Sequence, residues 1–215
     1  MKDSIKSYLD ELLFRYPKLE VCKQDIIDAY YLLENAYMNG KKLLIAGNGG
    51  SAADSEHIVG ELMKGFKLPR KISAEQKDKL IQIDPVLGET LSNVLQGSLK
   101  AISLVGHPGL TTAFMNDCDP TLCFAQQLNG FGDLGDVFLG ISTSGNSKNV
   151  IYAALTAKSK GMFVIGLTGE KDSKLSSIAD ICIKVPETEV FKVQELHLPV
   201  YHCICLMLEE RFFGE

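Results

Sequence analysis

Residues 43–63 read LLIAGNGGSAADSEHIVGELM, and the architecture of the chain can be inferred outward from this segment. Its first four residues, 43–46, are all apolar, which is typical of a buried parallel strand. The glycine-rich turn 47–50 follows, and Ser51 is expected to open a helix, with Asp54 three positions on as in a capping box. A strand, a glycine turn and a helix N-terminus together form an anion site, because unpaired N–H groups and the positive end of the helix dipole point the same way.

The predicted helix carries His57 and Glu61, which are four residues apart. Residues at this spacing lie on one helical face, one turn from each other. An imidazole and a carboxylate placed in this way can share one metal ion or one substrate. Taken alone, His57 would more often be a helix-surface residue than a ligand.

Composition limits the classes of function. The chain has 215 residues and a formal net charge of −5, so it can bury a real core and gives no electrostatic reason to expect nucleic-acid binding. Six cysteines occur without a CxxC pair, which indicates reduced, mostly buried thiols. No apolar run approaches the roughly 20 residues that span a bilayer, and MKDSIKSYLDELLF lacks the apolar core of a signal peptide. We therefore expect a cytoplasmic protein that does not associate with membranes.

Strands alternate with helices along the chain. Helical spacing of apolar residues predicts helices at about 4–15 and 23–39, so residues 1–40 form a helical segment that packs on the sheet or on a neighbouring subunit. The pattern predicts a single α/β domain over residues 1–215, a three-layer α/β/α sandwich with a five-stranded, mostly parallel sheet. Besides 43–46, the expected strands are 101–105, 137–141, 163–167 and 181–185, and a last helix covers about 189–213.

Residues 66–98 are the least regular part and are interpreted as an irregular insertion. Ser73 with Gln76 three positions later resembles a helix start, and Pro85 marks a break. The basic residues near the start of this segment predict a solvated face, with a lid over the site as the alternative.

A second polar loop, STSGNS at residues 142–147, follows the expected strand 137–141. Its hydroxyls and backbone N–H groups can wrap a phosphate without a fixed positive charge, whereas a simple helix cap would need only one hydroxyl. Neither this loop nor GNGGS matches a nucleotide P-loop or a dinucleotide fingerprint. Ligands in such folds lie beyond the carboxyl ends of the strands, where both loops are expected.

The candidate metal set consists of His57, Glu61, Gln194 and His202. Gln194 and His202 are eight residues apart, about 12 Å along a helix, which is wide for two ligands of one ion. Either long side chains lean together, with metal bonds of about 2.1 Å, or the ligands come from different subunits. Spacing alone leaves the metal undecided. His197 is interpreted as a structural or supporting residue.

Three segments carry a resemblance to a known family: LLIAGNGGSAADSEHIVGEL, DVFLGISTSGNSKNVI and VQELHLPVYHCICLMLEE. They resemble the sugar isomerase (SIS) fold and, more narrowly, the sedoheptulose 7-phosphate isomerase (phosphoheptose isomerase) family. STSGNS alone marks the superfamily, while HxxxE after GNGGS together with QExHxxxxH is much narrower. The resemblance covers most of the chain except about 66–98, where KGFKLPRK and a longer insertion replace the short basic turn usual in the family.

The resemblance implies a ketose–aldose isomerase that works through an enediol, as a homotetramer with sites at subunit interfaces. It implies one Zn²⁺ per subunit, with Glu61 and His202 as general base and acid. The zinc ligands implied are His57, Glu61, Gln194 and His202. The substrate contacts implied are Asn48, Gly49, Gly50, Ser51, Glu61, Asn116, Asp117, Ser142, Thr143, Ser144, Ser147 and Gln194.

Sedoheptulose 7-phosphate is thus the expected substrate and D-glycero-D-manno-heptose 7-phosphate the product, at the first step of nucleotide-activated heptose biosynthesis for lipopolysaccharide, capsule or another surface glycan. One alternative is an isomerase of another sugar phosphate, because the insertion can reshape the pocket. A second is a non-catalytic SIS protein of the type that associates with the replication initiator, although Glu61 and His202 favour an enzyme. A sugar-phosphate-sensing regulator is disfavoured, since residues 1–40 are too short and too acidic for a DNA-binding domain.

Overall fold

The computed structural model describes residues 1–214, and its centre is a five-stranded sheet. All strand pairs are parallel and the strand order is β2-β1-β3-β4-β5, which confirms the α/β prediction and makes the sheet wholly parallel. Apolar runs without alternation form these strands because helices cover both faces of the sheet. The strands are β1 (Leu43–Ala46), β2 (Ala101–Ser103), β3 (Val137–Ile141), β4 (Phe163–Thr168) and β5 (Ile181–Lys184).

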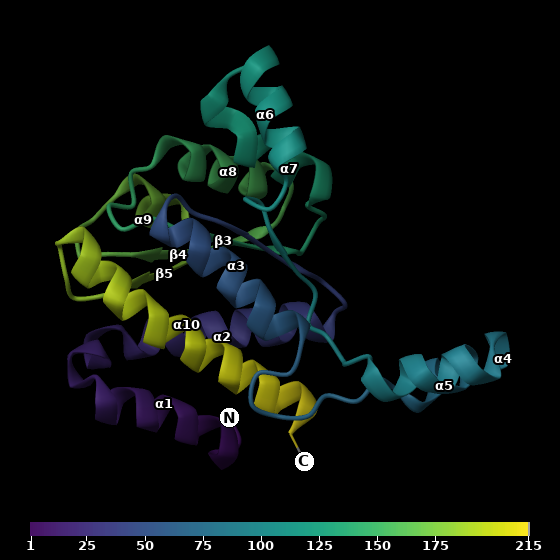
Figure 1. Ribbon diagram of the computed structural model, residues 1–215. Helices are drawn as coiled ribbons and strands as arrows, with labels where there is room; N and C mark the ends of the chain where they lie inside the picture. Colours follow the sequence, from purple (N-terminus) through teal and green to yellow (C-terminus); the bar gives the residue numbers. More distant parts are fainter. Residues whose placement is uncertain (215) are drawn as a thin grey trace.

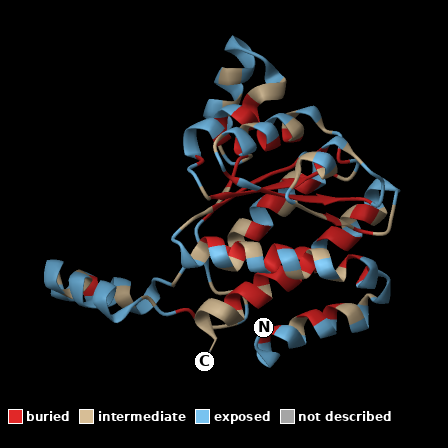
Figure 2. Ribbon diagram, turned by 180° about the vertical axis from the view of Figure 1, so that it is seen from behind, coloured by how far each residue is buried: buried red, intermediate tan, exposed pale blue. Residues whose placement is uncertain are grey.

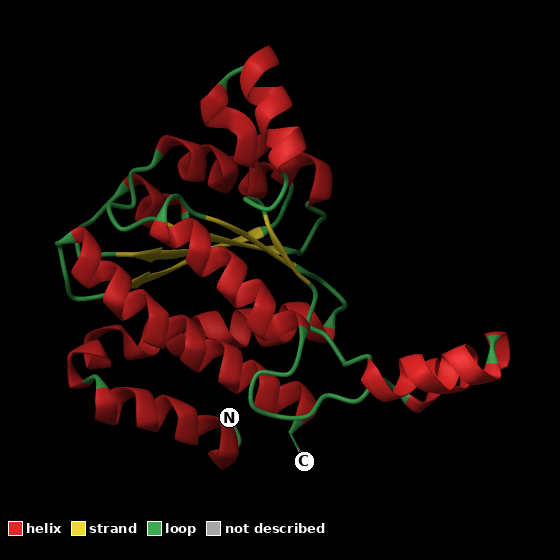
Figure 3. Ribbon diagram, viewed as in Figure 1, coloured by secondary structure: helices red, strands yellow, loops and turns green. Residues whose placement is uncertain are grey.

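Helices form a layer on each face of the sheet (Figures 1 and 3). On one face, α7, α8 and α9 pack on a core that includes Leu44 and Phe138. On the other face, α2, α3 and α10 pack on a core that includes Ile45 and Ile165, so buried residues fill both layers (Figure 2). The bounds are α2 (Lys23–Met38), α3 (Gly50–Met63), α7 (Cys123–Phe131), α8 (Lys148–Ser159), α9 (Lys174–Ile178) and α10 (Val190–Phe213).

The first helix, α1 (Asp3–Arg15), lies outside α10 rather than on the sheet (Figure 1). Ile5, Leu9 and Leu12 are buried in the same core as α2 and α10. The 3₁₀ segment η1 (Pro17–Cys22) then leads into α2. The N-terminal helices therefore pack on their own subunit, and α10 lies between α1 and the sheet layer.

Residues 66–98 are not irregular, contrary to the sequence-based expectation. They contain two helices, α4 (Ala74–Ile83) and α5 (Pro85–Val94), which pack on each other and project from the body (Figure 1). Ser73 caps α4 by accepting from the Gln76 N–H at 3.2 Å, as its spacing predicted. Gly88 is the only residue of these two helices that is buried within the chain.

One local expectation about a helix start is wrong. Asp54 does not cap α3, since that helix begins at Gly50 with Gly49 as N-cap and without a side-chain cap. Asn116 and Asp117 are the last residues of α6 (Pro108–Asp117). A 3₁₀ turn, η2 (Pro120–Leu122), then precedes α7. Among the described residues, no helix combines the length and apolar character that a membrane crossing requires.

Candidate active site

The two predicted anion loops lie next to each other at the carboxyl edge of the sheet. β1 and β3 are neighbours with Ala46 opposite Gly140, so the loops that follow them start side by side. Asn48 and Asn149 join the loops by a reciprocal amide pair, with Nδ2–Oδ1 distances of 2.9 and 2.8 Å. The topology therefore brings the glycine loop against the first turn of α8.

The serine loop 142–147 is held in shape by its own polar groups. The Ser142 and Ser147 hydroxyls lie 3.0 Å apart, and the Ser144 hydroxyl accepts from the Asn146 N–H at 3.2 Å. Ser147 is the N-cap residue of α8, yet its side chain makes no cap hydrogen bond. Helix capping alone therefore does not account for the arrangement of these hydroxyls. Within the loop, Thr143 is half-buried and its carbonyl accepts from the Gly169 N–H at 3.0 Å.

The glycine loop meets the last helix at Gly50. A Cβ atom at Gly50 would lie only 2.7 Å from the Gln194 Nε2 atom, so the Gln194 side chain rests on the first turn of α3. Ser51 beside it is 3% exposed, while Gly49 adopts a φ of 57°, which favours glycine. Gln194 therefore lies at the glycine loop. It is eight residues, about two helical turns, before His202 on α10.

α3 and α10 bring together the three candidate ligands His57, Glu61 and His202. His57 Nε2 lies 3.2 Å from Glu61 Oε1 and 3.4 Å from His202 Nε2. The second carboxylate oxygen, Glu61 Oε2, is buried and forms no hydrogen bond with the described residues, while Lys64 Nζ lies 3.7 Å away. These three residues meet within one subunit, so for them the alternative of ligands from different subunits is not required.

The donor atoms fit a divalent cation in type and in part of their geometry. Two ligands of a tetrahedral zinc ion, each about 2.1 Å from the metal, are about 3.4 Å apart, close to both distances measured from His57 Nε2. Glu61 Oε2 accepts no hydrogen bond from the described residues, so a cation or a group of the substrate would satisfy it. Within residues 1–214, however, no group of three or more His, Cys, Asp or Glu side chains is already arranged to enclose a metal ion. A metal would therefore require side-chain closure around His57.

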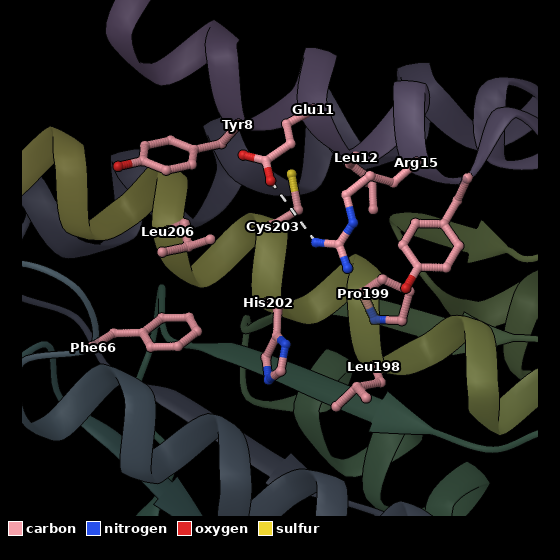
Figure 4. Close-up of a pocket in the computed structure, with 11 residues that line it drawn as sticks. Tyr8, Glu11, Leu12, Arg15, Phe66, Leu198, Pro199, His202, Cys203 and Leu206 are labelled. Carbon is pink, nitrogen blue, oxygen red and sulfur yellow. Dashed lines mark ion pairs between the residues drawn. The ribbon is translucent and has the colours of Figure 1, made fainter.

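Burial and a neighbouring imidazole shift the pKa of one residue in this cluster, His202. Burial, together with the neighbouring His57, lowers the pKa of His202. A lowered pKa favours the neutral imidazole near pH 7, the form that can accept a proton or bind a metal. His202 also faces a pocket of about 310 Å³ between α1 and α10, where Glu11, Arg15 and Phe66 lie around it (Figure 4).

Four supporting residues were missed by sequence reasoning. Tyr201 OH donates to Asp54 Oδ1 at 3.2 Å and lies 3.0 Å from His57 Nδ1. Arg70 donates to the carbonyls of Glu61 and Leu62, at 2.8 and 2.7 Å, and so occupies the C-terminal end of α3. Glu209 pairs with Arg70 and accepts the N–H groups of residues 66, 67 and 68. Asp54, one turn before His57, and Glu209, a charge in an apolar helix, were the available signals.

Asn116 and Asp117 are not brought to the cluster by any contact among the described residues. Both are exposed at the end of α6, and their side chains hydrogen bond to each other at 2.9 Å.

His197 is fully buried, and burial lowers its pKa to about 4, consistent with a structural residue. His107 is the N-cap residue of α6.

The fold and the paired loops define an SIS-domain protein, and residues 99–169 match the family model of the SIS domain. A phosphoheptose isomerase from Aneurinibacillus thermoaerophilus is 38% identical over 177 residues, covering 82% of this chain and 76% of that protein. One from Geotalea daltonii is 39% identical over 184 residues, covering 86% and 82%. The structure of a phosphoheptose isomerase from Neisseria gonorrhoeae superposes with a TM-score of 0.73 at 27% identity, covering 97% of this chain and 98% of the other. The chain therefore belongs to the phosphoheptose isomerase family and is a sugar-phosphate isomerase.

Proposed function

We propose that the chain converts sedoheptulose 7-phosphate into D-glycero-D-manno-heptose 7-phosphate through an enediol. The observation that carries this proposal is the convergence of Glu61 and His202 on His57, which lies on the same helix, α3, that begins at the glycine loop. The relatives named phosphoheptose isomerase support the choice of substrate. In the proposed pathway, the product feeds nucleotide-activated heptose for lipopolysaccharide, capsule or another surface glycan.

The reaction moves one proton between C1 and C2 of the sugar and another between their oxygens. Glu61 is the proposed base for the carbon proton, because its Oε2 atom is free of hydrogen bonds and shielded from water. His202 is the proposed partner at the oxygens, because an imidazole can both accept and donate a proton and its Nε2 atom lies in the same cluster, 3.4 Å from His57 Nε2. A carboxylate that also held a metal ion would be a weaker base, so the proposed role of Glu61 would require its Oε2 atom to be free of the ion.

We propose Zn²⁺ as the metal, held by His57, Glu61 and His202, with Gln194 as a fourth ligand. Support comes from the two imidazole Nε2 atoms, 3.4 Å apart, and from Glu61 Oε1, which lies 3.2 Å from His57 Nε2. When bound, a divalent ion stabilises negative charge on the sugar oxygens. Because Gln194 rests against Gly50, its participation requires the side chain to turn along α10.

The phosphate group is proposed to bind between the two loops. Ser51, Ser142, Thr143, Ser144 and Ser147 supply hydroxyls there, and Asn48, Gly49 and Gly50 supply the glycine turn at the start of α3. Backbone N–H groups at the N-termini of α3 and α8 add favourable dipoles for an anion. Asn116 and Asp117 remain proposed substrate contacts, and they require a movement of α6 or a neighbouring subunit to reach the sugar.

We further propose a homotetramer in the cytoplasm. Support for self-association comes from α4 and α5, whose large apolar side chains lack cover within the chain. Val86 and Val94 are 73% and 71% exposed. Isolated helices shorter than about 12–15 residues are marginal in water, so a projecting pair of ten-residue helices gains stability from a surface that covers it.

An alternative assignment is an isomerase for another sugar phosphate. The departure from the family pattern at residues 66–98 favours this alternative, because the insertion can reshape the pocket.

A substrate panel tests the proposal. Purified protein is incubated in D₂O with sedoheptulose 7-phosphate, fructose 6-phosphate or ribulose 5-phosphate, and the products are followed by NMR. We expect conversion of the heptulose phosphate, with deuterium entering at C2 of the aldose, because the base exchanges its proton with solvent. Faster conversion of another ketose phosphate would contradict the substrate, and binding without conversion of any of them would contradict the enzymatic role.

A further inference from the structure

A short chain of polar contacts lies behind His57, on the side away from Glu61 and His202. His57 Nδ1 lies 3.0 Å from the hydroxyl of Tyr201, and that hydroxyl lies 3.2 Å from Asp54 Oδ1. Tyr201 is 3% exposed, so water does not compete freely for its hydroxyl. Asp54 and His57 are one turn apart on α3, and Tyr201 reaches them from α10.

The direction of these hydrogen bonds follows from the number of protons available. An ionised carboxylate only accepts, and a tyrosine hydroxyl carries one proton. If Tyr201 donates to Asp54, its oxygen can only accept from His57 Nδ1. A tyrosine hydroxyl has an ordinary pKa of about 10, so it keeps its proton near neutral pH.

We propose that Asp54 and Tyr201 are positioning residues that hold His57 in the tautomer with its proton on Nδ1 and a free electron pair on Nε2. His57 Nε2 lies 3.2 Å from Glu61 Oε1 and 3.4 Å from His202 Nε2. The Glu61 carboxylate only accepts, so it favours a proton on Nε2 and competes with the Tyr201 oxygen, which lies 3.0 Å from Nδ1. A metal-binding histidine usually has its other ring nitrogen fixed by such a hydrogen bond, which sets tautomer and ring orientation. The consequence for zinc rests on the proposed function, but the tautomer itself does not.

Nitrogen NMR of the metal-free protein reads the tautomer directly. The protein is labelled with ¹⁵N-histidine, and two-bond ¹H–¹⁵N correlations are recorded near pH 8, with the His57 signals assigned from a His57→Gln variant. We expect Nδ1 to carry the proton in the wild type. In Tyr201→Phe the acceptor of that proton is lost, so the proton is expected to move toward Nε2.

Asp54→Asn is a second variant that preserves the shape of the side chain. An asparagine amide can donate to the Tyr201 oxygen, which frees the hydroxyl to donate to His57 Nδ1 and reverses the tautomer. Tyr30→Phe is the matched control, because Tyr30 is also buried, at 1% exposure, but lies on α2 away from this cluster. It is expected to leave the His57 signals unchanged.

Zinc affinity, measured by competition with a chelator, provides the second readout. Both Tyr201→Phe and Asp54→Asn are expected to weaken binding by about 10- to 100-fold, and Tyr30→Phe to leave it unchanged. A wild-type His57 with its proton on Nε2 would overturn the inference, as would unchanged tautomers in both variants. A wild type with the expected tautomer but no zinc binding would support the inference and contradict the metal in the proposed function.

Discussion

Arg70 and Glu209 form an ion pair with a distance of 2.8 Å between Nε and Oε1, and their side chains are 0% and 1% exposed. The pair joins the end of α3 to α10, because Arg70 also binds the carbonyls of Glu61 and Leu62. Glu209 in turn accepts the backbone N–H of Phe66 and two further N–H groups of the same loop. The position of Glu61 therefore depends on a buried network that does not itself touch substrate.

Arg70→Met is expected to destabilise the fold strongly. It leaves the buried Glu209 carboxylate without its cation, and breaking such a pair typically costs about 3–5 kcal/mol. Urea unfolding measures the loss. Lys79→Met is the control, since Lys79 pairs with Glu75 in solvent and such pairs contribute about 0–1 kcal/mol. A loss below about 1 kcal/mol in Arg70→Met would show that the network does not stabilise α3.

The stability contributed by Glu209 is expected to vanish in acid. Burial alone would raise its pKa, but the N–H groups of residues 66–68 together with Arg70 outweigh burial and hold the pKa of Glu209 below its usual range. A depressed folded-state pKa gives stability that is present above the unfolded value of about 4.3 and is lost as pH falls through the folded value. Comparing the unfolding free energies of wild type and Glu209→Gln should show a large gap at pH 7 that narrows below about pH 4. A gap that stays constant down to about pH 3 would contradict this linkage.

Gly50→Ala is expected to impair the site without unfolding the protein. The new methyl group would lie 2.7 Å from Gln194 Nε2, the movable end of a side chain, so Gln194 must shift. Catalytic efficiency should fall about tenfold, equivalent to about 1.4 kcal/mol, with melting temperature unchanged. Gly130→Ala is the matched control in α7, because no atom lies within 4 Å of its added Cβ. Equal effects of the two substitutions would show that Gln194 has no part in the reaction.

The proposed self-association through α4 and α5 can be tested by introducing charged side chains on α5. Leu87→Glu and Leu91→Glu place carboxylates on side chains that are 62% and 44% exposed in the single chain. If a neighbouring subunit covers them, burial of an unpaired charge disrupts the assembly, and sedimentation velocity should show a smaller species. Asn93→Glu, also on α5 and exposed, should leave the assembly intact. A tetramer that persists in both leucine variants would place the interface elsewhere.

Much of the fold was predictable because its signals are local. The strand 137–141 was predicted with its observed bounds, since a short apolar run between polar residues is long enough for a buried strand but too short for a buried helix. The hairpin of α4 and α5 was interpreted as an irregular insertion, and the structure shows two helices whose large apolar side chains are not covered within the chain. The cues at Ser73 and Pro85 were correct, yet they do not indicate that two helices pack on each other.

The candidate active site shows the same contrast between features with local sequence signals and features that depend on how elements pack. His57 and Glu61 could be paired from their spacing on one helix, whereas their approach to His202 depends on how α3 packs on α10. Asp54 was interpreted as a cap because its sequence position fits one, but Tyr201 competes for its carboxylate across the helix interface. Interactions of this kind join residues more than 140 positions apart, and no periodicity in the sequence encodes them.

The proposed function depends above all on Glu61 abstracting the carbon proton of a heptulose phosphate. The decisive experiment compares the wild type with Glu61→Gln for conversion of sedoheptulose 7-phosphate, with phosphosugar binding measured in parallel. We expect aldoheptose phosphate from the wild type, a loss of turnover of about 100- to 10,000-fold in Glu61→Gln, and binding retained in both. Near-normal turnover in Glu61→Gln, or no turnover in the wild type, would contradict this role of Glu61.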